Sequence, residues 1–415
     1  MICTEHTTCR VCGSTYLTSV LNLGEPVLSD FVSPTAPDPP RVPLDFVICD
    51  DCELVQLRHT TNPDLLYVRQ YWYRSSVNET MRAELADIVQ KATVMVGGLT
   101  KRDAVLDIGA NDGYLLSRYA GGASLPLRIA YEPALSLNET LRPHTDLLVP
   151  ALFPNEFDNV HAVRRQVKIA TSIAVFNHVD DPRRFVDAID YLLSDDGVWV
   201  MQVQDLAQTI KATAYDSICH EHVTFDSLKT FEALLVGFDL EVAAVETRAI
   251  NGGSLRVYVR RKDAVSPWTA SVVEARQAEA WVDREALARF AARVARHKDQ
   301  LVGSIDFALS QGSTIDLYAA STKSSTLLQH CGIGTERIRC AVERTPEKWW
   351  LVTSGTRIPI LSEETWREDP APLLLIGAWQ FAKFFQQREA AYLANGGRFL
   401  IPLPQTELVE QRMAV

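Results

Sequence analysis

The stretch AVLDIGANDGYLL, residues 104–116, decides the fold. A run of apolar residues leads into Asp107, Gly109, Asn111 and Gly113, which alternate with other residues, and apolar residues resume directly afterwards. Glycines at such a turn let the backbone approach a ligand closely, as they do in the nucleotide-binding crevice of an α/β sheet. The stretch therefore predicts a buried strand, a ligand-binding turn and the start of a helix.

The spacing of this turn distinguishes between nucleotide cofactors. A dinucleotide fingerprint reads G-x-G-x-x-G, whereas residues 107–113 read D-x-G-x-x-x-G and no third glycine is close. The next apolar run, LRIAYEP, brings Glu132 to the end of a second strand, where a carboxylate can accept hydrogen bonds from both ribose hydroxyls. This combination argues against NAD or FAD and predicts S-adenosylmethionine as the cofactor.

Strand-like runs alternate with helical patterns along most of the chain. An amphipathic pattern from about residue 78 to 96 predicts a helix. Nearly continuous apolar runs, separated by such patterns, are typical of a doubly wound α/β sheet with helices on both faces. These runs are VKIATSIAVF and GVWVMQVQ in the middle of the chain and STIDLYAAS, IRCAVER, PAPLLLIG and RFLIPL near its end.

A chain of 415 residues is longer than one hydrophobic core usually organises, so several domains are expected. A helical segment rich in Ala, Arg and Glu, about residues 270–310, separates the two α/β regions. We predict a small N-terminal module at 1–70, a central Rossmann-like methyltransferase domain at 71–268, a helical connector at 269–310 and a smaller C-terminal α/β domain, which would bind the acceptor, at 311–415.

Two Cys-x-x-Cys pairs lie in the N-terminal part, Cys9 with Cys12 and Cys49 with Cys52. Four thiolates from two such pairs can surround a zinc ion tetrahedrally and leave no open position for chemistry, so the predicted role is structural. The metal would hold together a Pro-rich segment that is too small to fold on its own core. The alternative is four unrelated free cysteines.

The composition restricts the partners. A formal net charge of −11 argues against binding to nucleic acid or to an anionic membrane surface. Both partners carry negative charges, which an acidic protein cannot neutralise. The N-terminus lacks a charged start followed by an apolar segment, and no window approaches about 18 uninterrupted apolar residues. We therefore expect a cytoplasmic protein, with no membrane or nucleic-acid partner, that acts on a small molecule.

Two polar segments follow the predicted fourth and fifth strands. FNHVDDP brings Asn177 and His178 to the end of the fourth strand, and SICHEHVTF, residues 217–225, follows the fifth. Ligands of such sheets lie beyond the carboxyl ends of the strands, so both segments are expected to face the crevice. His178 either contacts a ligand or makes one backbone hydrogen bond. The CHEH sequence is a metal site, a general base with its neighbours, or a polar surface loop.

The chain resembles the sugar C-methyltransferases of deoxysugar antibiotic biosynthesis, which methylate C-3 of nucleotide-linked 4-keto-hexoses. The motifs that carry the resemblance occur in the family's order and span nearly the whole chain: CRVCGS with CDDC, YWYRSS, DIGANDGYLL, FNHVDDP, YDSICHEHVTF, NGGSLRVYV and YAASTKSSTLLQHCGIG. The resemblance implies zinc on the four cysteines and an acceptor between the central and C-terminal domains. The expected partner is a nucleotide-linked keto-sugar, bound by a monomer or homodimer.

The resemblance also implies roles for the residues of the CHEH segment. In that family the base must remove a weakly acidic proton beside a ketone before the carbon attacks the methyl group. By resemblance His222 is the base, Glu221 orients it or balances its charge, and His178 and Tyr73 assist around the enolate oxygen. A metal at this place would need third and fourth ligands, and only Cys219 is near.

The chain departs from the family where the acceptor should bind. Cys219 stands where the family usually has a tyrosine, which replaces a phenol by a weaker hydrogen-bond donor. Gln202 and Asp205 replace a usual Glu and Tyr, Phe225 replaces a Tyr, and Asn251 replaces a His. The sequence thus supports methyl transfer better than it supports the identity of the acceptor. The alternatives are O- or N-methylation of another small molecule and a binding protein that keeps the cofactor without turnover.

Lys323 follows the strand-like run STIDLYAA at the opening of a predicted helix. A cation beside free backbone N–H groups can hold a diphosphate. The alternative is a solvated lysine on the surface. We expect Lys323 and Asn251 on the acceptor side of the site.

Overall fold

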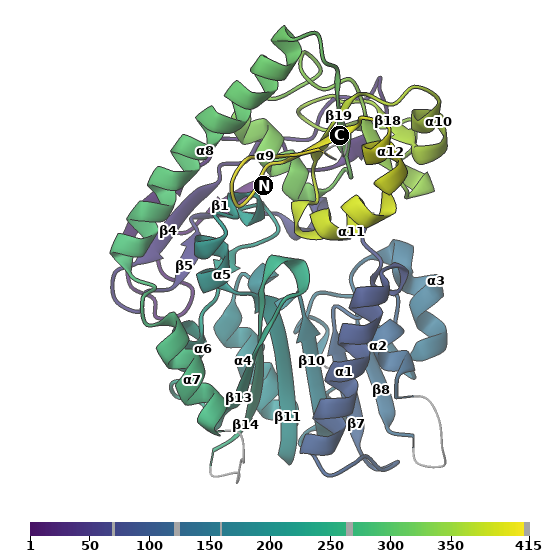
Figure 1. Cartoon of the computed structure of the whole chain (residues 1–415). Helices are drawn as coiled ribbons and strands as arrows, with labels where there is room; N and C mark the ends of the chain where they lie inside the picture. Colours follow the sequence, from purple (N-terminus) through teal and green to yellow (C-terminus); the bar gives the residue numbers. More distant parts are fainter. Residues whose placement is uncertain (69–70, 120–124, 158–159, 263–268, 411–415) are drawn as a thin grey trace.

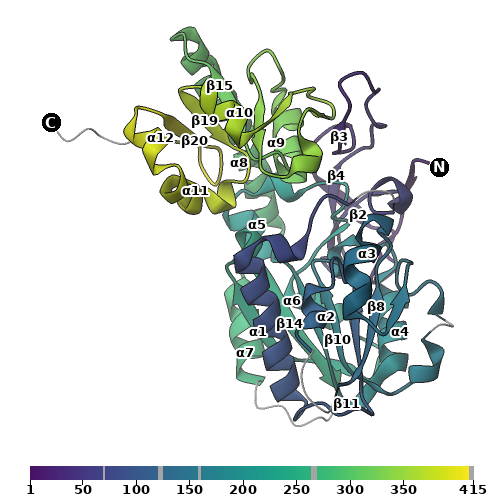
Figure 2. The ribbon, with the colours of Figure 1, turned by 90° about the vertical axis from the view of Figure 1, so that its right-hand side faces the viewer.

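The computed structural model describes residues 1–68, 71–119, 125–157, 160–262 and 269–410. A central domain and a C-terminal domain lie one above the other, and the N-terminal module packs beside both (Figures 1 and 2). Each of the two larger domains is built around one sheet with helices against it. The expected α/β architecture is confirmed.

The central domain holds a seven-stranded sheet in which β14 is antiparallel to both neighbours, while β11, β10, β7, β8 and β9 pair in parallel. Parallel strands that are covered on both faces read as continuous apolar runs, as these do in the sequence. The spatial order is β13 (Leu240–Arg248), β14 (Ser254–Arg261), β11 (Leu193–Gln204), β10 (Val167–Ile173), β7 (Ala104–Ile108), β8 (Leu127–Tyr131) and β9 (Leu147–Val149).

Helices cover both faces of this sheet, because successive strand residues point to opposite sides. Val105 packs in one core with α1 (Glu79–Met95), and Leu106 packs in another with α4 (Pro182–Leu192). Asn78 accepts hydrogen bonds from the first N–H groups of α1, which fixes where that helix begins. The remaining helices of the domain are α2 (Tyr114–Ser117), α3 (Asn138–Leu141), α5 (Leu206–Lys211), α6 (Leu228–Leu234) and α7 (Thr269–Glu279).

The N-terminal module shares sheets with both other domains. Its antiparallel strands β2 (Leu17–Asn22), β4 (Asp45–Cys49) and β5 (Val55–Leu57) are extended by β12 (Thr224–Phe225), which comes from the central domain. Two further short pairs join β1 (Cys3–Glu5) to β6 (His59–Thr61) and β3 (Phe31–Val32) to β17 (Val352–Thr353) of the C-terminal domain. The module is therefore part of the same folded body as the two domains.

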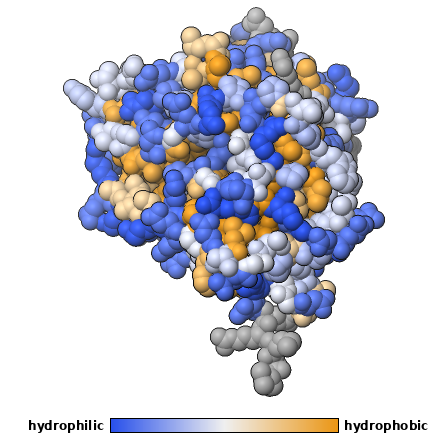
Figure 3. Space-filling view, turned by 90° about the horizontal axis from the view of Figure 1, so that it is seen from above, coloured by the Kyte–Doolittle hydropathy of each residue, from blue (hydrophilic) through white to orange (hydrophobic). Residues whose placement is uncertain are grey.

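The C-terminal domain holds a six-stranded sheet that is parallel except for its last strand. Figure 3 shows the molecule from above, with hydrophilic residues interspersed with groups of hydrophobic ones. The apolar side chains of the sheet, such as Leu374, Ile376 and Phe399, are buried. The order is β18 (Ile360–Ser362), β16 (Ala341–Glu343), β15 (Ile315–Tyr318), β19 (Leu373–Ile376), β20 (Arg398–Ile401) and β21 (Glu407–Glu410), with α9 (Thr322–Cys331), α10 (Glu363–Glu368), α11 (Ala382–Arg388) and α12 (Ala390–Ala394).

The helical segment expected over about residues 270–310 is two helices. The chain turns at 280–283, and Asp283 caps the start of α8 (Arg284–Ser310) by accepting from the N–H of Ala286. Whereas α7 packs on β13, α8 packs against β4 of the module and against the C-terminal domain (Figure 1). Among the described residues, no helix is both long and apolar enough to cross a membrane.

Candidate active site

The glycine-rich turn after β7 closes against the end of β8. The N–H groups of Gly109 and Ala110 both donate to the carbonyl of Tyr131, at 2.8 and 3.0 Å. Gly109 has a φ of +69°, and a Cβ there would come within 2.3 Å of Val175. Only glycine fits this close approach.

Asp107, at the end of β7, is buried and accepts a hydrogen bond from Thr171 at 2.6 Å. Burial raises its pKa to about 7.

Glu132 lies at the end of β8, as the sequence predicts for a ribose-binding carboxylate. Its two oxygens accept from the backbone N–H groups of Asn111 and Ala134, each at 2.8 Å. Burial raises its pKa above the ordinary value, while these two hydrogen bonds oppose the rise. A carboxylate has further lone pairs, so both oxygens remain able to accept from ribose hydroxyls.

The YWYRSS segment folds over this turn. Ser75 donates its N–H to Asn111 Oδ1 at 3.0 Å, and Asn111 Nδ2 donates to the carbonyl of Tyr73 at 3.1 Å. Asn177 reaches the same edge of the sheet, and its Oδ1 is buried without a hydrogen-bond partner in the part of the chain that the structure describes. A buried, unpaired acceptor next to a glycine turn and a carboxylate fits a polar ligand such as S-adenosylmethionine.

We expect Glu132→Ala to weaken binding of S-adenosylhomocysteine by about 10- to 100-fold, because hydrogen bonds to a charged group contribute about 1.5–3 kcal/mol. Calorimetric titration measures the affinity, and Glu139→Ala, an exposed carboxylate on α3, is the matched control. A folded Glu132→Ala protein that binds as tightly as the unaltered chain would exclude Glu132 from the cofactor site.

His178 and His222 meet beyond the ends of β10 and β11. Their rings stack with centroids 5.2 Å apart, and the ring of Tyr67 also stacks on His178, with centroids 5.6 Å apart. The hydroxyl of Tyr67 donates to the backbone carbonyl of Glu221 at 3.2 Å. Burial and the neighbouring His222 lower the pKa of His178 well below its ordinary value. The two histidines therefore lie together as neutral rings.

The tautomer of His222 follows from its hydrogen bond. Its Nδ1 lies 2.8 Å from the carbonyl oxygen of Ser217, and a carbonyl can only accept, so Nδ1 carries the hydrogen. Nε2 then holds a lone pair. Burial and, next, the positive charge of Lys323 lower the pKa of His222 to about 4. The ring is therefore an uncharged proton acceptor at neutral pH.

The neighbours of His222 in sequence are also perturbed. Burial raises the pKa of Glu221 to about 7, and Thr322 of the C-terminal domain donates to its Oε1 at 3.3 Å. Burial raises the pKa of Cys219 to about 12, so this residue remains a thiol. His220 is buried and bonds the carbonyl of Val42 through Nε2 at 2.9 Å. Within this segment, Glu221 therefore has a pKa near neutral, and His222 is a neutral ring whose Nε2 is left as an acceptor by the bond of Nδ1 to Ser217.

The C-terminal domain contributes Lys323, the second residue of α9. Its Nζ donates to Gln204 Oε1 at 3.4 Å and to the carbonyl of Asn251 at 3.2 Å. Asp216 lies at the same junction, with Oδ2 accepting from Trp379 Nε1 at 2.8 Å and Oδ1 buried without a partner among the described residues. Polar groups of both domains thus converge beside His222.

Among the ring contacts and hydrogen bonds of the described residues, Tyr73 is joined to neither histidine. Its side chain is 44% exposed, and it is its backbone carbonyl that contacts Asn111. Tyr67, which sequence reasoning missed, is the tyrosine that stacks on His178. Burial raises the pKa of the Tyr73 phenol to about 12, so its hydroxyl stays protonated.

The four predicted metal ligands come together. The Sγ atoms of Cys9, Cys12, Cys49 and Cys52 all lie within 4.8 Å of one another. Sulfurs that bind one tetrahedral zinc ion at about 2.3 Å must lie this close. The four cysteines therefore fit a structural zinc site.

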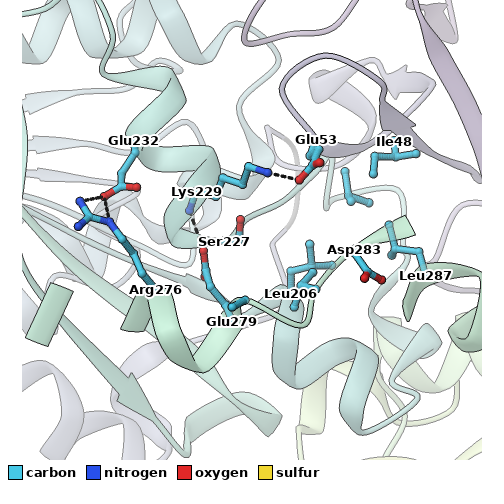
Figure 4. Close-up of a pocket in the computed structure, with 13 residues that line it drawn as sticks. Ile48, Glu53, Leu206, Ser227, Lys229, Glu232, Arg276, Glu279, Asp283 and Leu287 are labelled. Atoms are coloured by element: carbon cyan, nitrogen blue, oxygen red, sulfur yellow. Dashed lines mark hydrogen bonds and ion pairs between the residues drawn. The ribbon is translucent and has the colours of Figure 1, made fainter. Parts of the chain in front are cut away.

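The pocket of about 240 Å³ in Figure 4 lies away from these groups, between the module, α6 and the start of α8. Its charged side chains are paired with one another: Lys229 with Glu53, and Arg276 with Glu232 at 2.5 Å. Glu279 accepts from the first N–H groups of α6. None of the predicted site residues lines this pocket, so it is a junction between helices.

Three family models match the chain in succession: a zinc binding domain at residues 9–67, a methyltransferase domain at 77–245 and a C-methyltransferase C-terminal domain at 249–404. The chain is an S-adenosylmethionine-dependent methyltransferase with a zinc-binding module. Its domain organisation is that of the C-methyltransferases, and the resemblance expected from the sequence is confirmed.

The C-methyltransferase NovU of Streptomyces niveus is 29% identical over 410 residues, which cover 97% of this chain and 96% of NovU. Among solved structures, the plantazolicin methyltransferase BpumL, in complex with SAH, is 12% identical over 43% of this chain and 82% of its own, with a TM-score of 0.35. The magnesium protoporphyrin IX methyltransferase of Synechocystis PCC 6803 is 9% identical over 44% and 79%, with a TM-score of 0.33.

Proposed function

We propose that the protein methylates a carbon next to the ketone of a nucleotide-linked keto-deoxysugar. The observation that carries the proposal is His222, a neutral ring whose Nδ1 is fixed on Ser217 and whose Nε2 holds a lone pair. A carbon acid needs such a base, because its proton must leave before a new carbon–carbon bond can form. The adjacent His178 and Glu221 supply further groups that can stabilise charge.

The chain's residues then act as follows. Nε2 of His222 accepts the proton from the carbon, and the electrons of that C–H bond pass into an enolate. His178 stabilises the enolate oxygen, and Glu221 balances the charge of the imidazolium that forms. When bound, S-adenosylmethionine would supply an electrophilic methyl group for this carbon, with S-adenosylhomocysteine as the leaving group. In this proposal Glu132 and the glycine turn would hold the cofactor, and Lys323 and Asn251 would contact the acceptor.

The acceptor class is tested by product analysis. The protein is incubated with S-adenosylmethionine that carries ¹³C in its methyl group and with a panel of nucleotide-linked 4-keto-6-deoxyhexoses. We expect NMR to show the labelled methyl group bonded to a carbon next to the ketone. A methyl group on oxygen would contradict C-methylation, and the absence of turnover across the panel would contradict the proposed acceptor class.

Cys219 supports a second candidate, O- or N-methylation of another small molecule. A buried thiol with a pKa of about 12 is a weak hydrogen-bond donor, so it stabilises an enolate less well than a phenol does. Methylation of oxygen or nitrogen needs less carbon-acid catalysis. The product analysis above distinguishes the two candidates.

Lys323 gives a prediction on the protonation of His222. Removing its charge in Lys323→Met should raise the pKa of His222 above about 4, because the lysine is the second cause that lowers it. A larger fraction of the rings would then be protonated, and unable to accept a proton, in mildly acidic solution. The His222 NMR signal, identified by its loss in His222→Asn, reports this pKa. Lys323→Arg keeps the charge and should leave it unchanged; an unshifted pKa in Lys323→Met would contradict the coupling.

A further inference from the structure

One buried side chain of the zinc-binding module, Arg10, is bonded to the segment that carries His178 and to the strand that lies beside His222. Arg10 lies between the first two zinc ligands, Cys9 and Cys12, and its side chain is only 1% exposed. A buried guanidinium has to be paired, because an unpaired buried charge is costly. Its partners therefore show what Arg10 is fixed to.

Each nitrogen of the Arg10 guanidinium has its own partner. Nε donates to Asp180 Oδ1 at 3.2 Å, Nη1 to the carbonyl of Leu57 at 2.6 Å, and Nη2 to the hydroxyl of Thr60 at 2.6 Å. Thr60 and His6 also contact Asp180, the latter at 3.0 Å. Asp180 belongs to the central domain and follows His178 by two residues.

The other partner of Arg10 leads to the second histidine. The N–H of Leu57 donates to the carbonyl of Val223 at 2.9 Å, and the N–H of Val223 donates to the carbonyl of Asn177 at 2.8 Å. Val223 directly follows His222, and Asn177 directly precedes His178. The hydrogen bonds therefore form a closed ring through Arg10, Leu57, Val223 and the segment from Asn177 to Asp180.

We propose that Arg10 is a positioning residue that helps to set the distance between His178 and His222, so that its side chain couples the zinc site to the proton-abstracting site. The proposal rests on the proposed function only for its effect on turnover. The pairing of β5 with β12 places Leu57 beside Val223. Arg10 is bonded directly to Asp180 in the His178 segment and to Leu57, whose N–H is bonded to Val223 next to His222, so it fixes the position of one segment relative to the other.

The test compares Arg10→Gln with Arg58→Gln. Arg58 is the matched control, because it makes an ion pair with Asp45 at 2.7 Å inside the same module but has no bond to either histidine segment. Histidines are labelled with ¹³C, and the signals of His178 and His222 are assigned from His178→Asn and His222→Asn. We expect Arg10→Gln to move both signals while the zinc content stays at one per chain, and Arg58→Gln to move neither.

Turnover is the second readout. Arg10→Gln should lower kcat by about 10- to 100-fold, as expected when catalytic groups are misplaced, with the affinity for S-adenosylhomocysteine unchanged. If Arg10→Gln fails to fold or loses zinc, Asp180→Asn serves as the test variant instead. It weakens the same ion pair by changing the partner in the central domain, whose side chain is partly exposed. Unmoved histidine signals in a folded variant of this pair would overturn the proposal.

The two proposals fail differently. Moved histidine signals together with a methyl group on oxygen would leave the positioning role standing and contradict the proposed function. C-methylation together with unmoved histidine signals in Arg10→Gln and Asp180→Asn would support the proposed function and contradict the positioning role of Arg10.

Discussion

Replacing His222 by asparagine is expected to lower turnover by about 10²- to 10⁴-fold, the factor typical of removing a general base. Asparagine can still donate a hydrogen bond to the carbonyl of Ser217, but it has no basic nitrogen to replace Nε2. The affinity for S-adenosylmethionine should stay nearly unchanged, because the cofactor is held by the turn after β7 and by Glu132. Initial rates and calorimetric titration measure the two quantities.

Two further variants serve as comparisons for His222→Asn. Glu221→Gln should lose less activity, because Glu221 balances charge and does not itself take the proton from carbon. His161→Asn removes a ring that contacts Tyr191 elsewhere in the domain, and it should leave turnover unchanged. If His222→Asn keeps most of the activity, the base role passes to His178 or Glu221, whose pKa of about 7 suits proton transfer at neutral pH.

Removing the zinc ion is expected to unfold the N-terminal module, because structural zinc sites contribute about 10–16 kcal/mol in small zinc-binding peptides. Cys49→Ser should lose the metal and lower the unfolding temperature strongly. Turnover should fall with it, since β5 of the module pairs with β12 directly after the CHEH segment. Cofactor affinity should change less, because Glu132 and the glycine turn lie in another domain.

The control for zinc is Cys3→Ser, since Cys3 lies outside the four-sulfur cluster. Metal analysis should give about one zinc per chain for this variant and for the unaltered protein. Proteolysis should cut the N-terminal module of Cys49→Ser but not that of Cys3→Ser. A zinc-free preparation whose module is fully folded would contradict the structural role of the metal.

Features that depend on neighbouring residues could be predicted from the sequence. The helix expected over about 78–96 is α1 (Glu79–Met95), because Asn78 caps it and its apolar residues recur with a helical period. The break before α8 was missed, although Asp283 is a capping residue and gave a local signal for it. The glycine turn and the Cys-x-x-Cys pairs were predictable because their spacing encodes their geometry.

Features that depend on tertiary contacts could not be predicted in the same way. The stacking of Tyr67 on His178 joins residues more than a hundred positions apart, and no local pattern indicates it. The same holds for the two-residue strand β12, which is too short to show periodicity. The position of Lys323 at the start of α9 was predictable, and the residue was expected to hold a diphosphate. Its contact with the carbonyl of Asn251 follows only from how the domains pack.

The central claim, that His222 removes a proton from carbon, is tested most directly by hydrogen exchange without methyl transfer. The protein is mixed in D₂O with S-adenosylhomocysteine, which carries no methyl group to transfer, and with a nucleotide-linked 4-keto-6-deoxyhexose. The unaltered protein should bring deuterium onto the carbon next to the ketone, and His222→Asn should not. Equal exchange in both proteins, or methylation of oxygen or nitrogen without any exchange, would contradict the claim.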